Sequence, residues 1–143
     1  MSFQDNFFLG FKLFSRFYAL PISAVYQVFH QEPSEQQSHI LKIDEMIVFE
    51  GEPFYLSRPD RVLPSHFDVD YQRDYKQNQQ DNVPQLKMPW VIVLKNRNAK
   101  SAKKGLGFRV EQIFNPFALN NEQHQSSVGG DTIAEKKYHV ILI

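Results

Sequence analysis

The chain has 143 residues, of which 42% are hydrophobic, which fits one domain with a core of useful size. Its 16 basic and 16 acidic residues give zero formal charge, so bulk charge offers no attraction to nucleic acid or to an anionic membrane. The absence of cysteine excludes disulfides, thiolate nucleophiles and thiol-bound metals. The N-terminus lacks the pattern of a signal peptide, and no apolar run approaches the ~20 residues of a membrane span. We therefore expect a cytoplasmic protein that does not insert into a membrane.

The first elements in the chain are predicted to form a β-hairpin. Residues 7–13 carry large apolar side chains at alternate positions, which is the period of a strand. Residues 17–20 follow a short polar turn and are predicted to return as the second strand, which Pro21 limits because proline lacks an N–H for the ladder. Ser23 is then predicted to cap a short helix over residues 24–29.

A second hairpin is predicted in the middle of the chain. Residues 40–49 begin another strand region, and the letters "FEGEPF" indicate a tight turn. Gly51 tolerates the positive φ that such a turn requires, and Pro53 opens the returning strand. The polar residues that come next, about 65–88, are predicted to form a long surface loop.

The last third of the chain is predicted to add three more strands. Residues 89–94 are a continuous apolar run, typical of a strand that is buried on both faces. Residues 105–114 alternate and are expected to pair with that strand, and residues 138–143 close the chain as a strand. The pattern predicts an all-β barrel or sandwich of about eight strands. Phe11 and Val93 are expected to be fully buried in different strands.

A search for chemistry gives little. The five histidines lie far apart, without the spacing of a metal site. Asp68 and Asp70 lack the glycine and the terminal glutamate of a calcium loop, and are interpreted as turn carboxylates. The "GLG" at residues 105–107 does not precede a helix start that would bind phosphate, and favours a close backbone approach within a β pair. The sequence therefore predicts no enzyme, no metal and no cofactor.

One segment leaves a second function class open. Residues 95–104 carry five lysine or arginine side chains and no acidic one, and they lie close to Trp90 in the sequence. A basic loop beside an aromatic face on a small β-barrel is one way to bind single-stranded nucleic acid. The other interpretation is a solvated turn whose lysines protect a sheet edge from aggregation.

Four stretches resemble, in the correct order, the motifs of CheW-like domains, the adaptor proteins of bacterial chemosensory arrays. They are similar to the family's opening strand with its turn and "LPI" segment, its "NLRG"-type hairpin, its "VIVL…GLxVDxV" strand pair and its closing strand, at residues 7–28, 40–58, 91–113 and 136–143. Gly51 takes the place of the final glycine of the hairpin, and Gly107, Val110 and Glu111 lie in register with the strand pair.

This resemblance implies a fold and a function. The fold would be two small, packed five-stranded β-barrels with one short helix near the N-terminus, and residues 1–143 would be a single CheW-like domain. The protein would be a non-enzymatic adaptor that couples receptors to a CheA-type histidine kinase by binding both. The implied partners are that kinase and a chemoreceptor of the methyl-accepting type, or an alternative sensory receptor. No cofactor and no nucleic acid are expected.

The resemblance also implies a partner-binding surface that includes Val25, Gln27, Glu50, Gly51 and Arg58. Glu50 stands where the family carries the receptor-contacting arginine of "NLRG", so an anion replaces a cation. A carboxylate that faces a carboxylate repels it. The partner of this chain is therefore expected to present Lys or Arg at that point.

Overall fold

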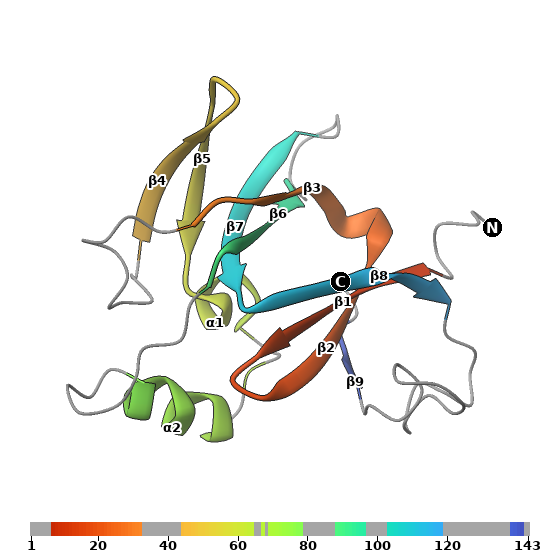
Figure 1. Cartoon of the computed structure of the whole chain (residues 1–143), viewed down its shortest axis with the longest axis vertical. Helices are drawn as coiled ribbons and strands as arrows, with labels where there is room; N and C mark the ends of the chain where they lie inside the picture. The colour runs from red at the N-terminus through yellow and green to blue at the C-terminus, as the bar shows by residue number, and fades with distance from the viewer. Residues whose placement is uncertain are drawn as a thin grey trace.

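The computed structural model of the chain describes residues 7–32, 44–64, 67, 69–78, 88–96, 103–118 and 138–141. Their strands form two sheets (Figure 1), one with the order β8-β1-β2-β9 and one with the order β3-β6-β7-β5-β4. The bounds are β1 Phe7–Leu13, β2 Arg16–Pro21, β3 Val25–His30, β4 Asp44–Phe49, β5 Glu52–Ser57, β6 Trp90–Lys95, β7 Lys104–Val110, β8 Gln112–Ala118 and β9 Tyr138–Val140. The all-β prediction is confirmed, and the five-stranded sheet has the strand number expected of one barrel.

Strands β1 and β2 form the predicted hairpin, with Leu9 opposite Leu20 and Phe11 opposite Tyr18. The turn residues Phe14 and Ser15 both have positive φ, 52° and 67°, as in a type I′ turn. Neither is glycine, so the turn is strained. The Glu111 carboxylate accepts a hydrogen bond from the Phe14 N–H and helps to hold this conformation.

Ser15→Gly is expected to raise the free energy of unfolding by about 0.5–1 kcal/mol, because glycine adopts positive φ without a Cβ penalty. The side chain of Ser15 is exposed, so little packing is lost. Urea denaturation would measure the change, with Ser15→Val as the opposite control, because a β-branched residue is least tolerant of positive φ. Equal stability of all three proteins would show that the turn is relaxed.

The segment after β2 differs from the prediction. The expected helix over residues 24–29 is wrong, since the helical part is a short 3-10 helix at Ile22–Ala24 and the chain then continues as β3. β3 pairs antiparallel with β6, with a bulge between Val25 and Gln27. The bulge adds one residue to the strand, so the side chains beyond it change faces. Apolar residues on one face then lie three or four positions apart in the sequence, which is also the spacing of a helix.

Strands β4 and β5 form the second predicted hairpin, and β6 pairs with β7 as expected. β5 and β7 run parallel, with Leu56 beside Gly107. A Cβ at Gly107 would lie 2.8 Å from the carbonyl oxygen of Ile92, so the predicted close backbone approach is present here.

The predicted strand over residues 105–114 is divided. β7 ends at Val110, and β8 begins at Gln112 in the other sheet. Glu111 makes the crossing, and its N–H donates to the Lys12 carbonyl oxygen in β1 at 3.1 Å. One continuous alternating stretch therefore supplies a strand to each sheet.

The predicted polar loop at about 65–88 is also partly wrong, because Val69–Asn78 is the helix α2. It follows the short helix α1, Pro59–Val62, and lies beside the β1–β2 hairpin (Figure 1). Tyr71 and Tyr75 of α2 are buried, and the Tyr71 ring lies 5.4 Å from that of Phe14. The helix is therefore a packed element of the core.

The buried side chains of the two sheets form three apolar clusters. The largest lies between the sheets and contains Phe11, Leu20, Ile92 and Phe108. The second fills the five-stranded sheet, and the third lies on the other side of the four-stranded sheet, around Phe8 and Tyr138. The prediction that Phe11 and Val93 are fully buried is confirmed, since both have 0% exposure.

The five-stranded sheet curls until its two edge strands, β3 and β4, meet. The rings of Phe29 and Phe49 stack with centroids 4.1 Å apart, and the Gln31 side-chain amide donates to the Val48 carbonyl oxygen at 2.9 Å. The second contact satisfies a backbone acceptor on the edge strand, which would otherwise be open to pairing with another chain. We call this curled sheet the β3–β7 barrel.

A buried cation fixes one end of the β3–β7 barrel. The Arg109 Nε donates to Glu45 Oε1 at 2.8 Å, and the two side chains are only 9% and 10% exposed. Arg109 also donates to the carbonyl oxygens of Gln31 and Met88, at 2.7 Å and 3.2 Å. One guanidinium thereby connects β7, β4 and the segments that flank β3 and β6.

Candidate partner-binding surface

The predicted site residues Val25 and Gln27 lie at the start of β3, on either side of its bulge. Both are half-buried, and Val25 packs against the core between the sheets. Val25 is paired with Leu94, near the end of β6. This pairing places both predicted residues at the end of the β3–β7 barrel opposite to Arg109.

The predicted residues Glu50 and Gly51 form the turn between β4 and β5. Their φ values are 52° and 82°, again as in a type I′ turn, and both are exposed. An added Cβ on Gly51 would meet no atom within 4 Å, so only the backbone conformation requires glycine there. The predicted turn is confirmed, and it places Glu50 at the exposed tip of the hairpin.

Side-chain contacts connect the start of β3 with the β4–β5 turn. The Tyr26 hydroxyl donates to Glu52 Oε2 at 3.4 Å, and the Lys104 ammonium lies 3.1 Å from the same oxygen. Lys104 also donates to the Pro53 carbonyl oxygen. One charged network at this end of the barrel is thus flanked by Val25, Gln27 and Glu50. In the sequence these residues are up to 25 positions apart.

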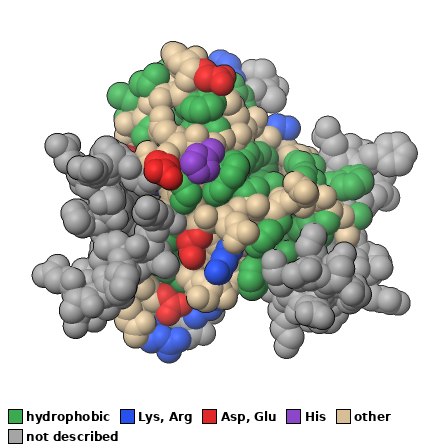
Figure 2. Space-filling view, in the orientation of Figure 1, with side chains coloured by type: hydrophobic (Ala, Val, Ile, Leu, Met, Phe, Trp, Pro, Cys, Tyr) green, Lys and Arg blue, Asp and Glu red, His purple; other side chains and the backbone are tan. Residues whose placement is uncertain are grey.

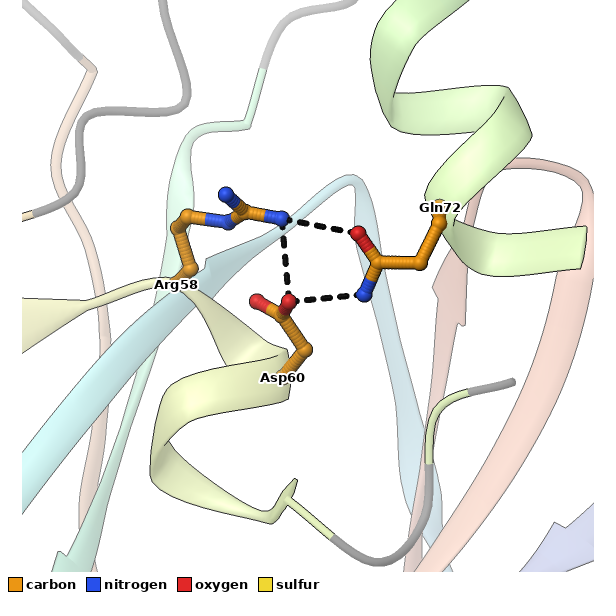
Figure 3. Close-up of polar contacts among 3 residues, drawn as sticks. All are labelled: Arg58, Asp60 and Gln72. Atoms are coloured by element: carbon orange, nitrogen blue, oxygen red, sulfur yellow. Dashed lines mark hydrogen bonds and ion pairs between the residues drawn. The ribbon is translucent and has the colours of Figure 1, made fainter. Parts of the chain in front are cut away.

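Arg58 lies elsewhere, at the end of β5, where it holds α2 (Figure 3). Its Nη2 donates to Asp60 Oδ2 at 2.9 Å and to Gln72 Oε1 at 3.2 Å, and the Gln72 amide donates to the same carboxylate oxygen at 2.8 Å. The guanidinium also lies 3.8 Å from the centroid of the Tyr75 ring. These contacts give Arg58 a role inside the protein, and its predicted place on the partner surface stays a prediction.

Burial of the two α2 tyrosines affects their titration. Burial raises the pKa of Tyr71 far above its ordinary value; the Asp60 carboxylate adds to the rise and Arg58 opposes it. Burial also raises the pKa of Tyr75, with Arg58 again opposing it. Both shifts favour the neutral hydroxyl, as expected for tyrosine rings that are packed in the core.

An apolar surface that the sequence analysis missed lies on the outside of the hairpin. It consists of exposed side chains on neighbouring strands, Met46, Val48, Pro53, Tyr55 and Leu106, which we call the outer hairpin face. Figure 2 shows hydrophobic side chains on the surface over the part of the molecule where Figure 1 draws β4 and β5. The available signal was that residues 46–49 and 53–56 are apolar at every position, the pattern of strands covered on both sides.

The basic segment predicted as an alternative site is described only in part, since residues 97–102 lie outside the described residues. Of its described cations, Lys104 is engaged by Glu52 and Pro53 and lies 4.8 Å from the centroid of the Phe54 ring. For Lys104, these contacts favour the interpretation of a basic turn that protects a sheet edge over that of a nucleic-acid contact. No observation on the described residues favours nucleic acid.

In the described part of the chain, no three His, Asp or Glu side chains are arranged to hold a metal ion. The same part holds no helix that is long and apolar enough to cross a membrane.

Comparison with known proteins identifies the fold. The structure is similar to the crystal structure of the scaffolding protein TtCheW from Thermoanaerobacter tengcongensis, with a TM-score of 0.51 over 97% of this chain and 90% of that chain. The chain has a CheW-like fold. The sequence identity is 12%, so the likeness concerns the fold alone. No family profile and no curated protein matches the sequence.

Proposed function

We propose that this protein is a non-enzymatic, cytoplasmic adaptor of a bacterial chemosensory pathway. It binds a CheA-type histidine kinase and a chemoreceptor, either methyl-accepting or of an alternative sensory type, and brings them together. The observation that carries this proposal is the likeness of nearly the whole chain to a scaffolding protein, with both sheets included. The ordered sequence motifs support it independently, because they resemble the same family at residues spread from 7 to 143.

The expected receptor side contains Val25, Gln27, Glu50 and Gly51, which lie at one end of the β3–β7 barrel. Val25 supplies apolar contact, Gln27 an adaptable amide, and Glu50 an exposed carboxylate. A receptor that offers a carboxylate to an arginine is therefore expected to bind this chain poorly, since Glu50 repels it. Arg58 belongs to the proposed surface only through the part of its side chain that remains accessible beside Asp60 and Gln72.

The test is a calorimetric titration of the purified chain against the CheA-type kinase and against the cytoplasmic part of the chemoreceptor encoded nearest to it. Saturable binding to both proteins is expected. A single-stranded oligonucleotide serves as the contrasting ligand, because binding of nucleic acid weakens steeply as salt rises. Salt-sensitive binding to the oligonucleotide, with no binding to either protein, would replace the adaptor proposal by the nucleic-acid alternative.

A further inference from the structure

Helix α2 is attached by side chains to both sheets. On the four-stranded sheet, the Tyr71 ring packs on the Phe14 ring in the β1–β2 turn. Arg16 Nη2, at the start of β2, also lies 3.1 Å from Asp74 Oδ2, and these two side chains are 32% and 23% exposed. Within the described residues, no backbone–backbone hydrogen bond joins α2 to a strand. The helix can therefore detach without the loss of any ladder hydrogen bond in the sheets.

The attachment to the five-stranded sheet covers Arg58, which follows β5. The Gln72 side chain accepts a hydrogen bond from its guanidinium and donates one to Asp60 (Figure 3), and the guanidinium carbon lies over the Tyr75 ring. The Arg58 side chain is only 18% exposed as a result. Because Gln72 and Tyr75 both belong to α2, departure of the helix would uncover the guanidinium and leave Asp60 beside it.

The contact between α2 and Arg58 leaves two polar atoms unsatisfied. Arg58 Nε and Asp60 Oδ1 are buried, yet neither atom has a hydrogen-bond partner within the described part of the chain. A buried polar atom without a partner costs free energy, which is recovered when the atom becomes hydrated. Detachment of α2 therefore regains hydration at the place where the Gln72 hydrogen bonds are lost.

A detached α2 would also lose its helical structure. The helix has ten residues, and isolated helices shorter than about 12–15 residues are marginal in water. Among its side chains from Tyr71 to Gln77, only those of Tyr71 and Tyr75 are buried. The helix therefore depends on the docking of these two rings, so detachment and unwinding form one cooperative step.

We propose that α2 is a strap that opens as one unit while both sheets remain folded, and that its opening uncovers the guanidinium of Arg58. The closed state dominates, because the burial of Tyr71 and Tyr75 is lost when the strap opens. A partner carboxylate can take Arg58 from α2 only in the open state, so the apparent affinity of such a contact is reduced by the open fraction. Because opening needs no partner, the strap is tested on the chain alone, independently of the adaptor function.

Native-state hydrogen exchange, followed by NMR at low urea concentrations, tests the opening. The amides at residues 73–78 of α2 are expected to exchange on the order of a hundredfold faster than those at residues 91–94 of β6, with a weaker dependence on urea. Exchange of α2 at the β6 rate, with the same urea dependence, would show that α2 opens only when the whole protein unfolds. That result would overturn the strap.

Gln72→Ala loosens the strap at the five-stranded sheet. It removes the hydrogen bonds with Arg58 and Asp60 and is expected to speed the exchange of α2 about tenfold, with no change in β6. Gln77→Ala is the matched control, because Gln77 is exposed on the same helix and the substitution changes helix propensity equally. The control is expected to stay within about twofold of the wild type. Equal exchange in the two variants would overturn the attachment of the strap at Arg58.

Arg16→Gln loosens the strap at the four-stranded sheet and leaves the sequence of α2 unchanged. The loss of the partly exposed pair with Asp74 is expected to speed the exchange of α2 about threefold. The modification of Arg58 by phenylglyoxal, followed by peptide mass spectrometry, is expected to become faster with it. Lys103→Gln, which removes an exposed cation before β7, is the control and is expected to change neither rate. Faster exchange of α2 with unchanged modification of Arg58 would overturn the uncovering.

Discussion

Arg109→Met is expected to lower the free energy of unfolding by about 3–5 kcal/mol, because it leaves the Glu45 carboxylate buried without its cation. The Glu45 and Arg109 side chains are 10% and 9% exposed, so water does not replace the lost partner. The substitution also removes the donor for the carbonyl oxygens of Gln31 and Met88. Urea denaturation followed by far-ultraviolet circular dichroism would measure the loss.

The control is the double variant Glu45→Gln/Arg109→Met, which removes both charges. It is expected to be more stable than Arg109→Met alone, because no unpaired charge is then buried. It should remain less stable than the wild type, since two carbonyl oxygens lose their donor. A single variant as stable as the wild type would show that the ion pair does not close this end of the barrel.

Tyr71→Ala is expected to cost about 3–5 kcal/mol, because it removes a large, fully buried ring and leaves a cavity under α2. The Tyr71 ring lies 5.4 Å from the ring of Phe14 and 4.8 Å from that of Phe67, so one truncation weakens the contact of α2 with the β1–β2 hairpin. The free energy of unfolding in urea would measure this effect.

Tyr71→Phe separates the ring from its hydroxyl and is expected to lose only about 1 kcal/mol. A loss below that value for Tyr71→Ala as well would mean that α2 does not pack in solution, and that the segment behaves as the surface loop predicted from its polar composition. Deletion of the segment that contains Tyr75 is expected to damage folding, because Tyr75 is a buried part of α2 and not of a surface loop.

The strands were predictable where one physical signal dominated. Residues 7–13 alternate large apolar side chains, and residues 90–95 are almost uniformly apolar, so burial on one face or on both selects a strand in either case. The turn at Glu50 and Gly51 was predictable because glycine supplies positive φ between two apolar runs.

Two local patterns were misleading for identifiable reasons. In β3, the bulge between Val25 and Gln27 places apolar residues at helical spacing, while the pairing with β6 makes the segment a strand. In α2, most residues are polar, and only the spacing of Tyr71 and Tyr75, four apart, indicated a helix with a buried stripe. Neither local pattern was strong enough to identify its element without knowledge of the strands that pack against it.

By itself the sequence determined the all-β class, both hairpins and the CheW-like order of motifs, because periodicity and turn residues act over a few positions. Tertiary structure alone decided which apolar faces are covered, since that depends on how the two sheets pack. It closed the β3–β7 barrel through Gln31 and Arg109, and it turned Arg58 toward α2 instead of toward solvent. It also left Met46 and Tyr55 exposed on the outside of the β4–β5 hairpin, because the four-stranded sheet covers β6 and β7 but does not reach β4.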